Sequence, residues 1–564
     1  MVDKITVEVI KNAAIYTSEE MGIVLRNTAY SPNIKDRLDH SCAILAPTGE
    51  IVAQAEHIPV HLGSMSIGVV NTVRMLKKLG KNLNPGDIVI VNDPYIAGTH
   101  LNDILAMKPV YYDGRLIAIV ANKAHHVDVG GSVPGSIGGK VTELLQEGTI
   151  IPPVKIVKDG RLDTEILRLI ESNVRTPRYF EGDLRAQIAS LNVGEKRILE
   201  LAKKYGSFAL LEAWSEILDY TERYTRRLLE DLGIQGSFYA RDYLELDDKL
   251  VNIDVTITFE KDKLIVDFAG THPQVDYPIN AVYGVTVAAT AFALKSVLDP
   301  EMPMNQGFLR VVEIKAPEGS LVNPVKPAPV SGGNVETSQR IADVVLRALA
   351  EALPDKVPAA SCGSMNNIMI GGITRDGRTW AFYETIGCGT GGRPCCDGVD
   401  AVHTNMTNTL NTPIEILEAE YPILFTRYEI RPSSGGQGKY RGGNGIIRGI
   451  RILSDKTTVS IVGERCRTRP WGLRGGMPGQ PAIYMVRYKD GRTKILPSKA
   501  TIQLNEGDEI IIMTAGGGGY GDPCEREQNL IEKDLEEGRI DEEWMKTLRS
   551  NCVDQGQNTY LESS

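Results

Sequence analysis

Histidine is concentrated in one short part of this sequence. The 564-residue chain has eight histidines, and six of them lie within 87 residues, where an even distribution would place about one. These six are His40, His57, His61, His100, His125 and His126. Histidine is the commonest metal ligand and the usual acid or base near neutral pH. The clustering therefore predicts a metal or catalytic site in this interval.

Two of these histidines each precede an aspartate by three residues: His100 precedes Asp103, and His125 precedes Asp128. Each pair follows a run of apolar residues, and the ends of buried strands commonly carry functional groups. A spacing of three places both side chains on one face of a helix, or lets both reach inward from a tight turn. Mixed imidazole and carboxylate ligands suit a divalent ion such as Mn²⁺, Fe²⁺ or Zn²⁺.

The simpler interpretation of one such pair is a hydrogen-bonded His–Asp contact without a metal, which is the more frequent arrangement in proteins. Here, however, two pairs follow two predicted strands, and Asp36, Asp39 and His40 precede a third. We therefore favour a metal or catalytic site.

The elements that must position these residues can be predicted from the spacing of apolar residues. Short apolar runs predict buried strands in the N-terminal part, and helical spacing predicts a first helix. The predicted strands are residues 42–45, 88–91, 116–120, 251–259 and 263–268, and the predicted helical regions are 5–27, 184–232, 337–352 and 525–550. Residues 446–513 are predicted to be rich in strands and turns.

The pattern indicates a mixed α+β fold with several lobes, because 564 residues exceed what one core usually organises. We expect an N-terminal strand-rich metal-site lobe with a helical segment, a central α/β lobe with glycine-rich loops, a β-rich C-terminal lobe and a charged helical tail. The expected boundaries are 1–235, 236–415, 416–525 and 526–564.

Composition narrows the possible classes of function. The net charge is −10 and no Lys/Arg run suggests a basic face, which argues against nucleic-acid binding. No signal peptide and no apolar stretch of membrane-spanning length is visible, so we expect a cytoplasmic protein without membrane contact. The eight cysteines have no zinc-finger spacing, and we expect mostly reduced, structural thiols.

Several glycine-rich motifs have a structural and a functional interpretation. Residues 516–521 contain GxGxxG, but no further strand completes a dinucleotide-binding unit, so a tight turn or loop is favoured. Residues 331–337 offer either an anion cradle or a capped helix start. No Walker A motif is present, so any ATP is expected on another chain.

The substrate-binding candidates are Asn334, within residues 331–337, and Arg393, which could bind a carboxylate or simply lie on the surface. Cys388, Cys395 and Cys396 could offer a nucleophile, although ordinary thiols in a glycine-rich loop are the favoured interpretation.

Several separated segments, in order, resemble the hydantoinase B/oxoprolinase family, and the resemblance extends to about residue 525. The family includes N-methylhydantoinase, 5-oxoprolinase and subunits of acetone and acetophenone carboxylases. The segments are 35–44 (KDRLDHSCAI), 92–103, 125–131 (HHVDVGG), 267–271 (DFAGT), 330–336 (VSGGNVE) and 517–523 (GGGYGDP).

The resemblance implies a B-type subunit of a hetero-oligomer, in which a hydantoinase A-type partner binds ATP and phosphorylates the substrate. It also implies a metal ion, manganese in the carboxylase branch, held by two histidines and two carboxylates. At the matching positions these ligands are Asp39, His100, Asp103 and His125. The chain is shorter than the carboxylase subunits, which favours the hydrolytic branch.

The resulting hypothesis is an ATP-dependent cyclic amidohydrolase that opens a lactam or hydantoin ring, of the 5-oxoproline or N-methylhydantoin class. Water activated by the metal would attack the phosphorylated amide, and His126 or Asp128 would be the catalytic base or would orient a ligand. Two alternatives remain, namely a subunit of an ATP-dependent ketone carboxylase and a docking subunit without chemistry of its own.

Overall fold

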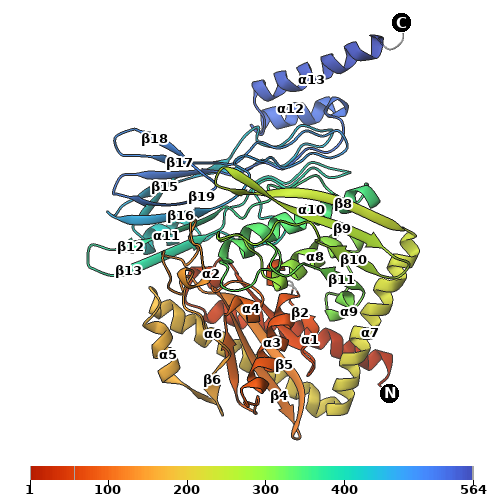
Figure 1. Cartoon of the computed structure of the whole chain (residues 1–564), viewed down its shortest axis with the longest axis vertical. Helices are drawn as coiled ribbons and strands as arrows, with labels where there is room; N and C mark the ends of the chain where they lie inside the picture. Colours follow the sequence, from red (N-terminus) through yellow and green to blue (C-terminus); the bar gives the residue numbers. More distant parts are fainter. Residues whose placement is uncertain (1, 56, 62, 562–564) are drawn as a thin grey trace.

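The computed structural model describes residues 2–55, 57–61 and 63–561 (Figure 1). This part of the chain forms a mixed α+β fold with 13 α-helices and 20 strands arranged in four sheets. The expectation of a mixed fold is confirmed. In Figure 1 the N-terminal sheet lies at the bottom and the C-terminal sheets lie at the top, with the central helices between them.

The N-terminal sheet has seven strands in the order β2-β1-β5-β4-β3-β6-β7, and every neighbouring pair is antiparallel. Its central strands are buried on both faces, which explains their continuous apolar runs. The strands are β1 (His40–Leu45), β2 (Ile51–Gln54), β3 (Ile88–Val91), β4 (Asp103–Tyr112), β5 (Arg115–His125), β6 (Val154–Lys158) and β7 (Arg161–Leu162).

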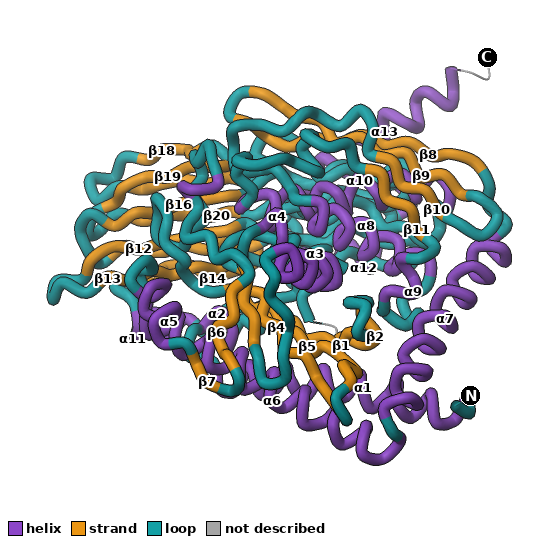
Figure 2. The backbone as a smooth tube through the Cα atoms, turned by 60° about the horizontal axis from the view of Figure 1, so that its bottom comes forward, coloured by secondary structure: helices purple, strands orange, loops and turns teal. Residues whose placement is uncertain are grey.

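Alternate residues of these strands enter two different cores, as the two-residue period of a strand requires. In β4, Ile104 and Ala106 pack toward the helices α1, α6 and α7, whereas Leu105 and Met107 pack toward α3. Figure 2 shows these helices on opposite sides of the sheet. The helices are α1 (Lys4–Thr28), α2 (Pro32–Lys35), α3 (Ser64–Lys78), α4 (Pro94–Ala97), α5 (Thr164–Glu171), α6 (Pro177–Tyr205) and α7 (Ser207–Leu232).

The central part combines a four-stranded sheet, in the order β11-β10-β9-β8, with the buried helices α8 and α10. A π-helical turn, Gly333–Thr337, leads directly into α10. The elements are β8 (Gly236–Leu246), β9 (Lys249–Phe259), β10 (Leu264–Asp267), β11 (Val312–Lys315), α8 (Tyr283–Leu298), α9 (Gln306–Leu309) and α10 (Ser338–Ala352).

Two antiparallel sheets form the C-terminal part, in the orders β13-β12-β16-β19 and β14-β15-β20-β17-β18. Ile370 and Ile461 of the first sheet and Ile450 and Ile512 of the second belong to one shared core. The elements are β12 (Asn367–Ile373), β13 (Thr379–Glu384), α11 (Ile414–Glu420), β14 (Ile423–Ile430), β15 (Ile446–Ile452), β16 (Thr457–Val462), β17 (Ile483–Arg487), β18 (Thr493–Leu496), β19 (Lys499–Leu504), β20 (Glu509–Met513), α12 (Gln528–Glu536) and α13 (Glu542–Leu561).

Three glycine-rich segments, 389–392, 435–445 and 516–521, lie side by side next to these sheets. Gly517 donates to the carbonyl of Gly443 (2.9 Å) and accepts from Gly436 (2.8 Å). A Cβ added to Gly517 would lie 1.9 Å from the carbonyl oxygen of Thr390, so no larger residue fits there. The GxGxxG motif is therefore part of an interlocked set of loops and not an isolated tight turn.

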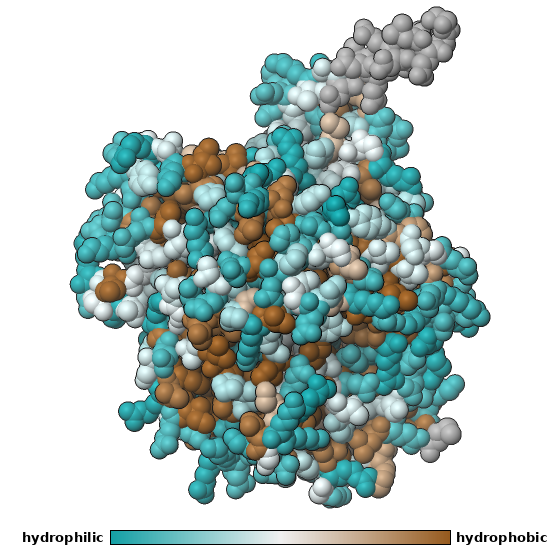
Figure 3. Space-filling view, viewed as in Figure 1, coloured by the Kyte–Doolittle hydropathy of each residue, from teal (hydrophilic) through white to brown (hydrophobic). Residues whose placement is uncertain are grey.

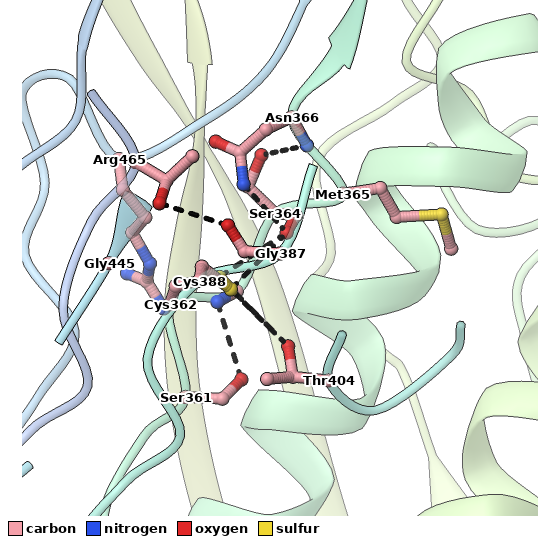
Figure 4. Close-up of a disulfide and its surroundings, with 12 residues drawn as sticks. Ser361, Cys362, Ser364, Met365, Asn366, Gly387, Cys388, Thr404, Gly445 and Arg465 are labelled. Carbon is pink, nitrogen blue, oxygen red and sulfur yellow. Dashed lines mark hydrogen bonds between the residues drawn. A yellow bond between two sulfur atoms is a disulfide. The ribbon is translucent and has the colours of Figure 1, made fainter. Parts of the chain in front are cut away.

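The expectation of mostly reduced thiols is wrong for four of the eight cysteines. Disulfides join Cys362 to Cys388 and Cys524 to Cys552, and Figure 4 shows the first pair beside Ser364 and Thr404. The partners are 26 and 28 residues apart in sequence and are brought together by the tertiary fold, so their spacing gave no sign of pairing. As a disulfide sulfur, Cys388 offers no thiolate nucleophile.

None of the described helices is both long and apolar enough to cross a membrane. The coloured part of the face in Figure 3 interleaves hydrophilic and apolar side chains, with the largest apolar area at its lower left.

Candidate metal centre

The ends of three neighbouring strands bring the predicted ligands together. Asp103 begins β4 and His125 ends β5, and the two residues are directly paired across the strands. The backbone N–H of His125 also donates to the carbonyl of Asp39, the residue before β1 (3.0 Å). His100 reaches the same place through a tight turn, in which Asp103 N–H donates to the His100 carbonyl (3.1 Å). The structure thus brings these residues, from three stretches of chain, close together; their role as metal ligands stays a prediction.

The side chains of His100, Asp103 and His125 form a compact buried cluster. His100 Nε2 lies 3.2 Å from His125 Nδ1 and 3.2 Å from Asp103 Oδ1. His125 Nδ1 lies 3.4 Å from the same Asp103 oxygen. All three residues are at most 2% exposed. These groups are the one set of three or more potential ligands found close together among the described residues.

The cluster fits a divalent cation. A ligand distance of about 2.1 Å places neighbouring ligand atoms roughly 3.0–3.4 Å apart around one ion, and the three observed separations are of this size. Asp103 Oδ1 is also buried without a hydrogen-bond donor among the described residues. A buried carboxylate oxygen without a donor is costly unless a charge compensates it. The donor set of two imidazoles and a carboxylate suits Mn²⁺, Fe²⁺ or Zn²⁺.

The fourth predicted ligand, Asp39, lies at the edge of this cluster. Its Oδ2 is 3.8 Å from His125 Nδ1 and 3.8 Å from the guanidinium of Arg37. Asp39 is therefore close enough to join the centre, but it also faces a buried positive charge.

His61 is a further member that the spacing of residues had not singled out. Its Nε2 lies 3.4 Å from Asp103 Oδ2, its Nδ1 lies 2.8 Å from Ser41 Oγ, and the residue is 2% exposed. His61 ends a short 3₁₀ turn (Pro59–His61), so no strand end marked it as a ligand. The only signal in the sequence was its membership of the histidine-rich interval.

Residues from the distant C-terminal part complete the surroundings of the cluster. The ring of Tyr383, in β13, stacks on His125 with centroids 4.6 Å apart and an angle of 9°. The guanidinium of Arg37 also lies against the Tyr383 ring, 4.7 Å from its centroid. Asn334 donates from Nδ2 to Asp103 Oδ2 (3.4 Å), and its own Oδ1 is buried without a partner among the described residues.

The electrostatics favour an ionised Asp103 carboxylate and a neutral His125 imidazole at the centre. Burial raises the pKa of Asp103, but the charges of His100 and His61 outweigh this effect and hold the pKa well below its usual value. Burial lowers the pKa of His125. Metal binding requires an ionised carboxylate and unprotonated imidazoles, so the pKa shifts of Asp103 and His125 are both in the direction that a metal site needs.

His126 and Asp128 point away from this cluster. His126 Nε2 contacts Gln187 Oε1 (3.1 Å) in α6, because successive residues of a strand face opposite sides. The Asp128 carboxylate accepts hydrogen bonds from the N–H groups of Gly130, Gly135 and Arg175 and from the Arg175 guanidinium, and so holds a loop. Their catalytic role stays a prediction that these contacts do not support.

The structure brings Asn334 to the centre but gives Arg393 no described contact with it. Arg393 is exposed and donates to the carbonyl of Asp397 (3.1 Å) in a glycine-rich loop. The N–H groups of Val330 and Ser331, which could have cradled an anion, both donate to the buried carboxylate of Glu147. Glu147 thereby positions the segment that carries Asn334.

A cavity of about 250 Å³ lies next to the cluster. His61 lines this cavity and also contacts Asp103, so it connects the two. The other walls include β1, the loop after β2, helix α8 and the segment that follows α8, with both polar and apolar side chains.

Comparison with known proteins places the chain in a family. The family model for hydantoinase B/oxoprolinase matches residues 3–523. The chain belongs to the hydantoinase B/oxoprolinase family. An uncharacterized protein of Methanocaldococcus jannaschii is 58% identical over 538 residues, which cover 95% of this chain and 94% of that protein.

Two named relatives differ in how much of them the chain covers. A putative B-type subunit of a D-/L-hydantoinase, from a Pseudomonas species, is 32% identical, with 96% of this chain and 94% of that protein covered. The 5-oxoprolinase of Dictyostelium discoideum is 37% identical over 92% of this chain, but the match spans only 40% of that longer protein.

Two solved structures share the fold. The ATP-dependent caprolactamase from Pseudomonas jessenii aligns with a TM-score of 0.88 and 28% identity, covering 96% of this chain and 95% of the other. Acetone carboxylase aligns with a TM-score of 0.92 over 100% of this chain and 84% of the other, at 19% identity, a level that shows similarity of fold alone.

Proposed function

We propose that this hydantoinase B-type chain is the ring-opening subunit of an ATP-dependent cyclic amidohydrolase. The observation that carries the proposal is the buried cluster of His100, Asp103 and His125 beside a cavity. Support comes from the similarity to an ATP-dependent caprolactamase and to a putative hydantoinase chain of the B type, each over nearly the full length of both chains. A lactam and a hydantoin share the cyclic amide, which defines the proposed substrate class.

The proposed reaction is divided between this chain and a partner subunit. Its sequence has no Walker A motif, and a separate A-type partner is proposed to hold ATP and to phosphorylate the amide oxygen. Phosphorylation removes the amide resonance, so the ring carbon becomes open to attack by water. This chain is proposed to receive the activated ring.

The residues that would hold the ion are His100, Asp103 and His125, with Asp39 as the fourth ligand. A divalent cation, manganese or alternatively zinc or iron, supplies Lewis acidity that makes hydroxide available near neutral pH. His61 and Asn334 both contact Asp103 Oδ2, so they orient the carboxylate. Asn334 Oδ1, which has no hydrogen-bond partner in the described part of the chain, is proposed to accept a hydrogen bond from a ring N–H. Arg393 remains a substrate-binding prediction without a contact to support it.

Reconstitution with an A-type partner tests this proposal. The two subunits, ATP and a divalent ion should open 5-oxoproline or N-methylhydantoin, and His100→Ala should reduce turnover by at least about 100-fold with loss of the ion. His272→Ala, which changes a histidine outside the cluster, is the matched control and should retain activity. Turnover near the wild-type rate in His100→Ala, with the metal retained, would contradict the proposal.

A further inference from the structure

The cavity beside the metal centre contains a second histidine, His57, that the metal cluster does not use. His57 and His61 both line this cavity, together with polar groups such as Ser41 and Asn408 and apolar side chains such as Phe292. His57 follows β2 in a loop whose backbone turns at Ala55, where His57 N–H donates to the Ala55 carbonyl (2.9 Å). A cyclic amide in this cavity would therefore contact His57 and also His61, whose Nε2 lies 3.4 Å from Asp103 Oδ2 of the metal centre.

Helix α1 holds the His57 ring in place with two residues of one face. Glu19 supplies a carboxylate, with Oε2 3.8 Å from His57 Nε2. Gly22, one turn further, supplies space, because a Cβ at this position would lie 2.3 Å from His57 Cε1. A glycine inside a helix costs about 1 kcal/mol relative to alanine. The helix thus accommodates the imidazole at a cost to its own stability.

The protonation state of the His57 imidazole suits a residue that accepts and donates a proton. Burial, and then the proximity of His61, lowers the pKa of His57 to about 4, so its imidazole is neutral near pH 7 and can accept a proton. Its Nδ1 is buried without a hydrogen-bond partner among the described residues. The Glu19 carboxylate would stabilise the imidazolium that forms transiently, as an orienting carboxylate does in other acid–base pairs.

We infer that the cavity binds the cyclic amide and that His57 is a catalytic residue that transfers a proton to the ring nitrogen, with Glu19 as its positioning residue. This inference rests on the proposed function. His57 would thus carry out the proton transfer that decides whether the cyclic amide opens.

That step can be written with its protons and electron pairs. Water adds to the phosphorylated amide carbon. The carbon of the adduct carries a hydroxyl group, the phosphate and the ring nitrogen, and the second proton of the water is now on this nitrogen. His57 accepts the hydroxyl proton and delivers it to the ring nitrogen. The C–N bond then breaks and its electron pair stays on nitrogen, which gives an amine and an acyl phosphate. A second water hydrolyses the acyl phosphate. Without protonation of nitrogen, the C–O bond to phosphate breaks instead and the intact ring returns.

The experiment measures this partition in the two-subunit enzyme with ATP, metal and 5-oxoproline in ¹⁸O-labelled water. The wild type should open about one ring for each ADP formed. The His57→Gln variant should open about 100-fold fewer rings for each ADP formed, which is within the range of general acid–base effects. At the same time ¹⁸O should enter the unopened lactam. Glu19→Gln should show the same change to a smaller extent. The metal content of both variants should equal that of the wild type, as should that of the control His272→Gln.

Three results would overturn the inference. One is a His57→Gln enzyme that still couples one ring opening to each ADP. Another is loss of the metal from this variant, which would make His57 part of the metal centre. The third is a folded, metal-loaded variant that forms no ADP and leaves the lactam unlabelled. If His57→Gln does not fold, the same criteria are applied to Glu19→Gln and to Gly22→Ala. The second of these variants displaces the His57 imidazole. A wild-type enzyme that opens no lactam would instead contradict the proposed function.

Discussion

Asp103 shows how a single side chain depends on its surroundings. Its carboxylate is buried, and His100, His125, His61 and Asn334 all lie within 3.4 Å of its two oxygens. Removing a carboxylate from water is costly unless charges and hydrogen bonds replace the water. The imidazoles and the proposed cation would provide that replacement, which is why we interpret this group of residues as a ligand set.

A half-buried histidine away from the centre, His403, makes stability depend on pH. Burial, together with Arg37, lowers the pKa of His403 to about 4, below its unfolded value of 6.5. The unfolded chain therefore binds this proton first as the pH falls. The stability that neutral His403 contributes is complete above pH 6.5 and is lost progressively toward pH 4.

His403→Gln removes this contribution. From about pH 7.5 to about pH 5.5 the free energy of unfolding of the wild type should change unfavourably by about 1.4 kcal/mol more than that of the variant. Urea unfolding of both proteins at the two pH values measures the difference. An identical change in both proteins would contradict the assignment of a neutral His403 in the folded protein.

Strands and helices were predictable where local pattern decides them. The runs at 42–45, 88–91 and 116–120 are parts of β1, β3 and β5, and the helical spacing over 5–27 marks α1. The apolar run underestimated β5, because pairing with β1 and β4 extends this strand through His125.

The contacts between distant elements could not be predicted in this way. The register that pairs Asp103 with His125 depends on the whole hairpin, and Tyr383 reaches His125 from a strand more than 250 residues further along the chain. His61 lies in a short turn without strand periodicity, and the disulfides join cysteines that are 26 and 28 residues apart. The family resemblance supplied the candidate metal ligands, whereas the sequence pattern alone gave only the interval in which they lie.

The interlocked glycine segments predict a sharp contrast between two glycine substitutions. Gly517→Ala places a methyl group 1.9 Å from the Thr390 carbonyl oxygen, so the segments must separate. The expected loss is about 3 kcal/mol or more of unfolding free energy. Gly372→Ala, in β12, meets no atom closer than 3.6 Å and should change stability by less than about 1 kcal/mol. Equal thermal unfolding temperatures for the two variants would contradict the close packing.

In the whole molecule, buried ion pairs join the central part to the C-terminal sheets. Arg465, which follows β16, lies 3.1 Å from Asp242 in β8 and 3.0 Å from Asp343 in α10. Arg340 contacts the same two carboxylates at 3.2 and 3.4 Å. All four side chains are at most 6% exposed, so loss of one partner leaves a buried charge uncompensated.

Arg465→Met should therefore lower the free energy of unfolding by about 3–5 kcal/mol. The control is Arg375→Met, which removes an exposed ion pair with Glu506 and should cost at most about 1 kcal/mol. Denaturant unfolding of both variants compares them. A loss in Arg465→Met no larger than in the control would show that the pairs do not join these parts.

The metal content of the purified chain tests the central claim most directly. Elemental analysis should find about one divalent ion per wild-type chain, because His100, Asp103 and His125 converge on one position. Asp103→Asn should bind at least about 100-fold less tightly, whereas Asp128→Asn, which changes a carboxylate outside the cluster, should retain the ion. A wild-type chain that remains metal-free after incubation with Mn²⁺, Zn²⁺ and Fe²⁺, or an Asp103→Asn variant that binds the ion as tightly as the wild type, would contradict the account.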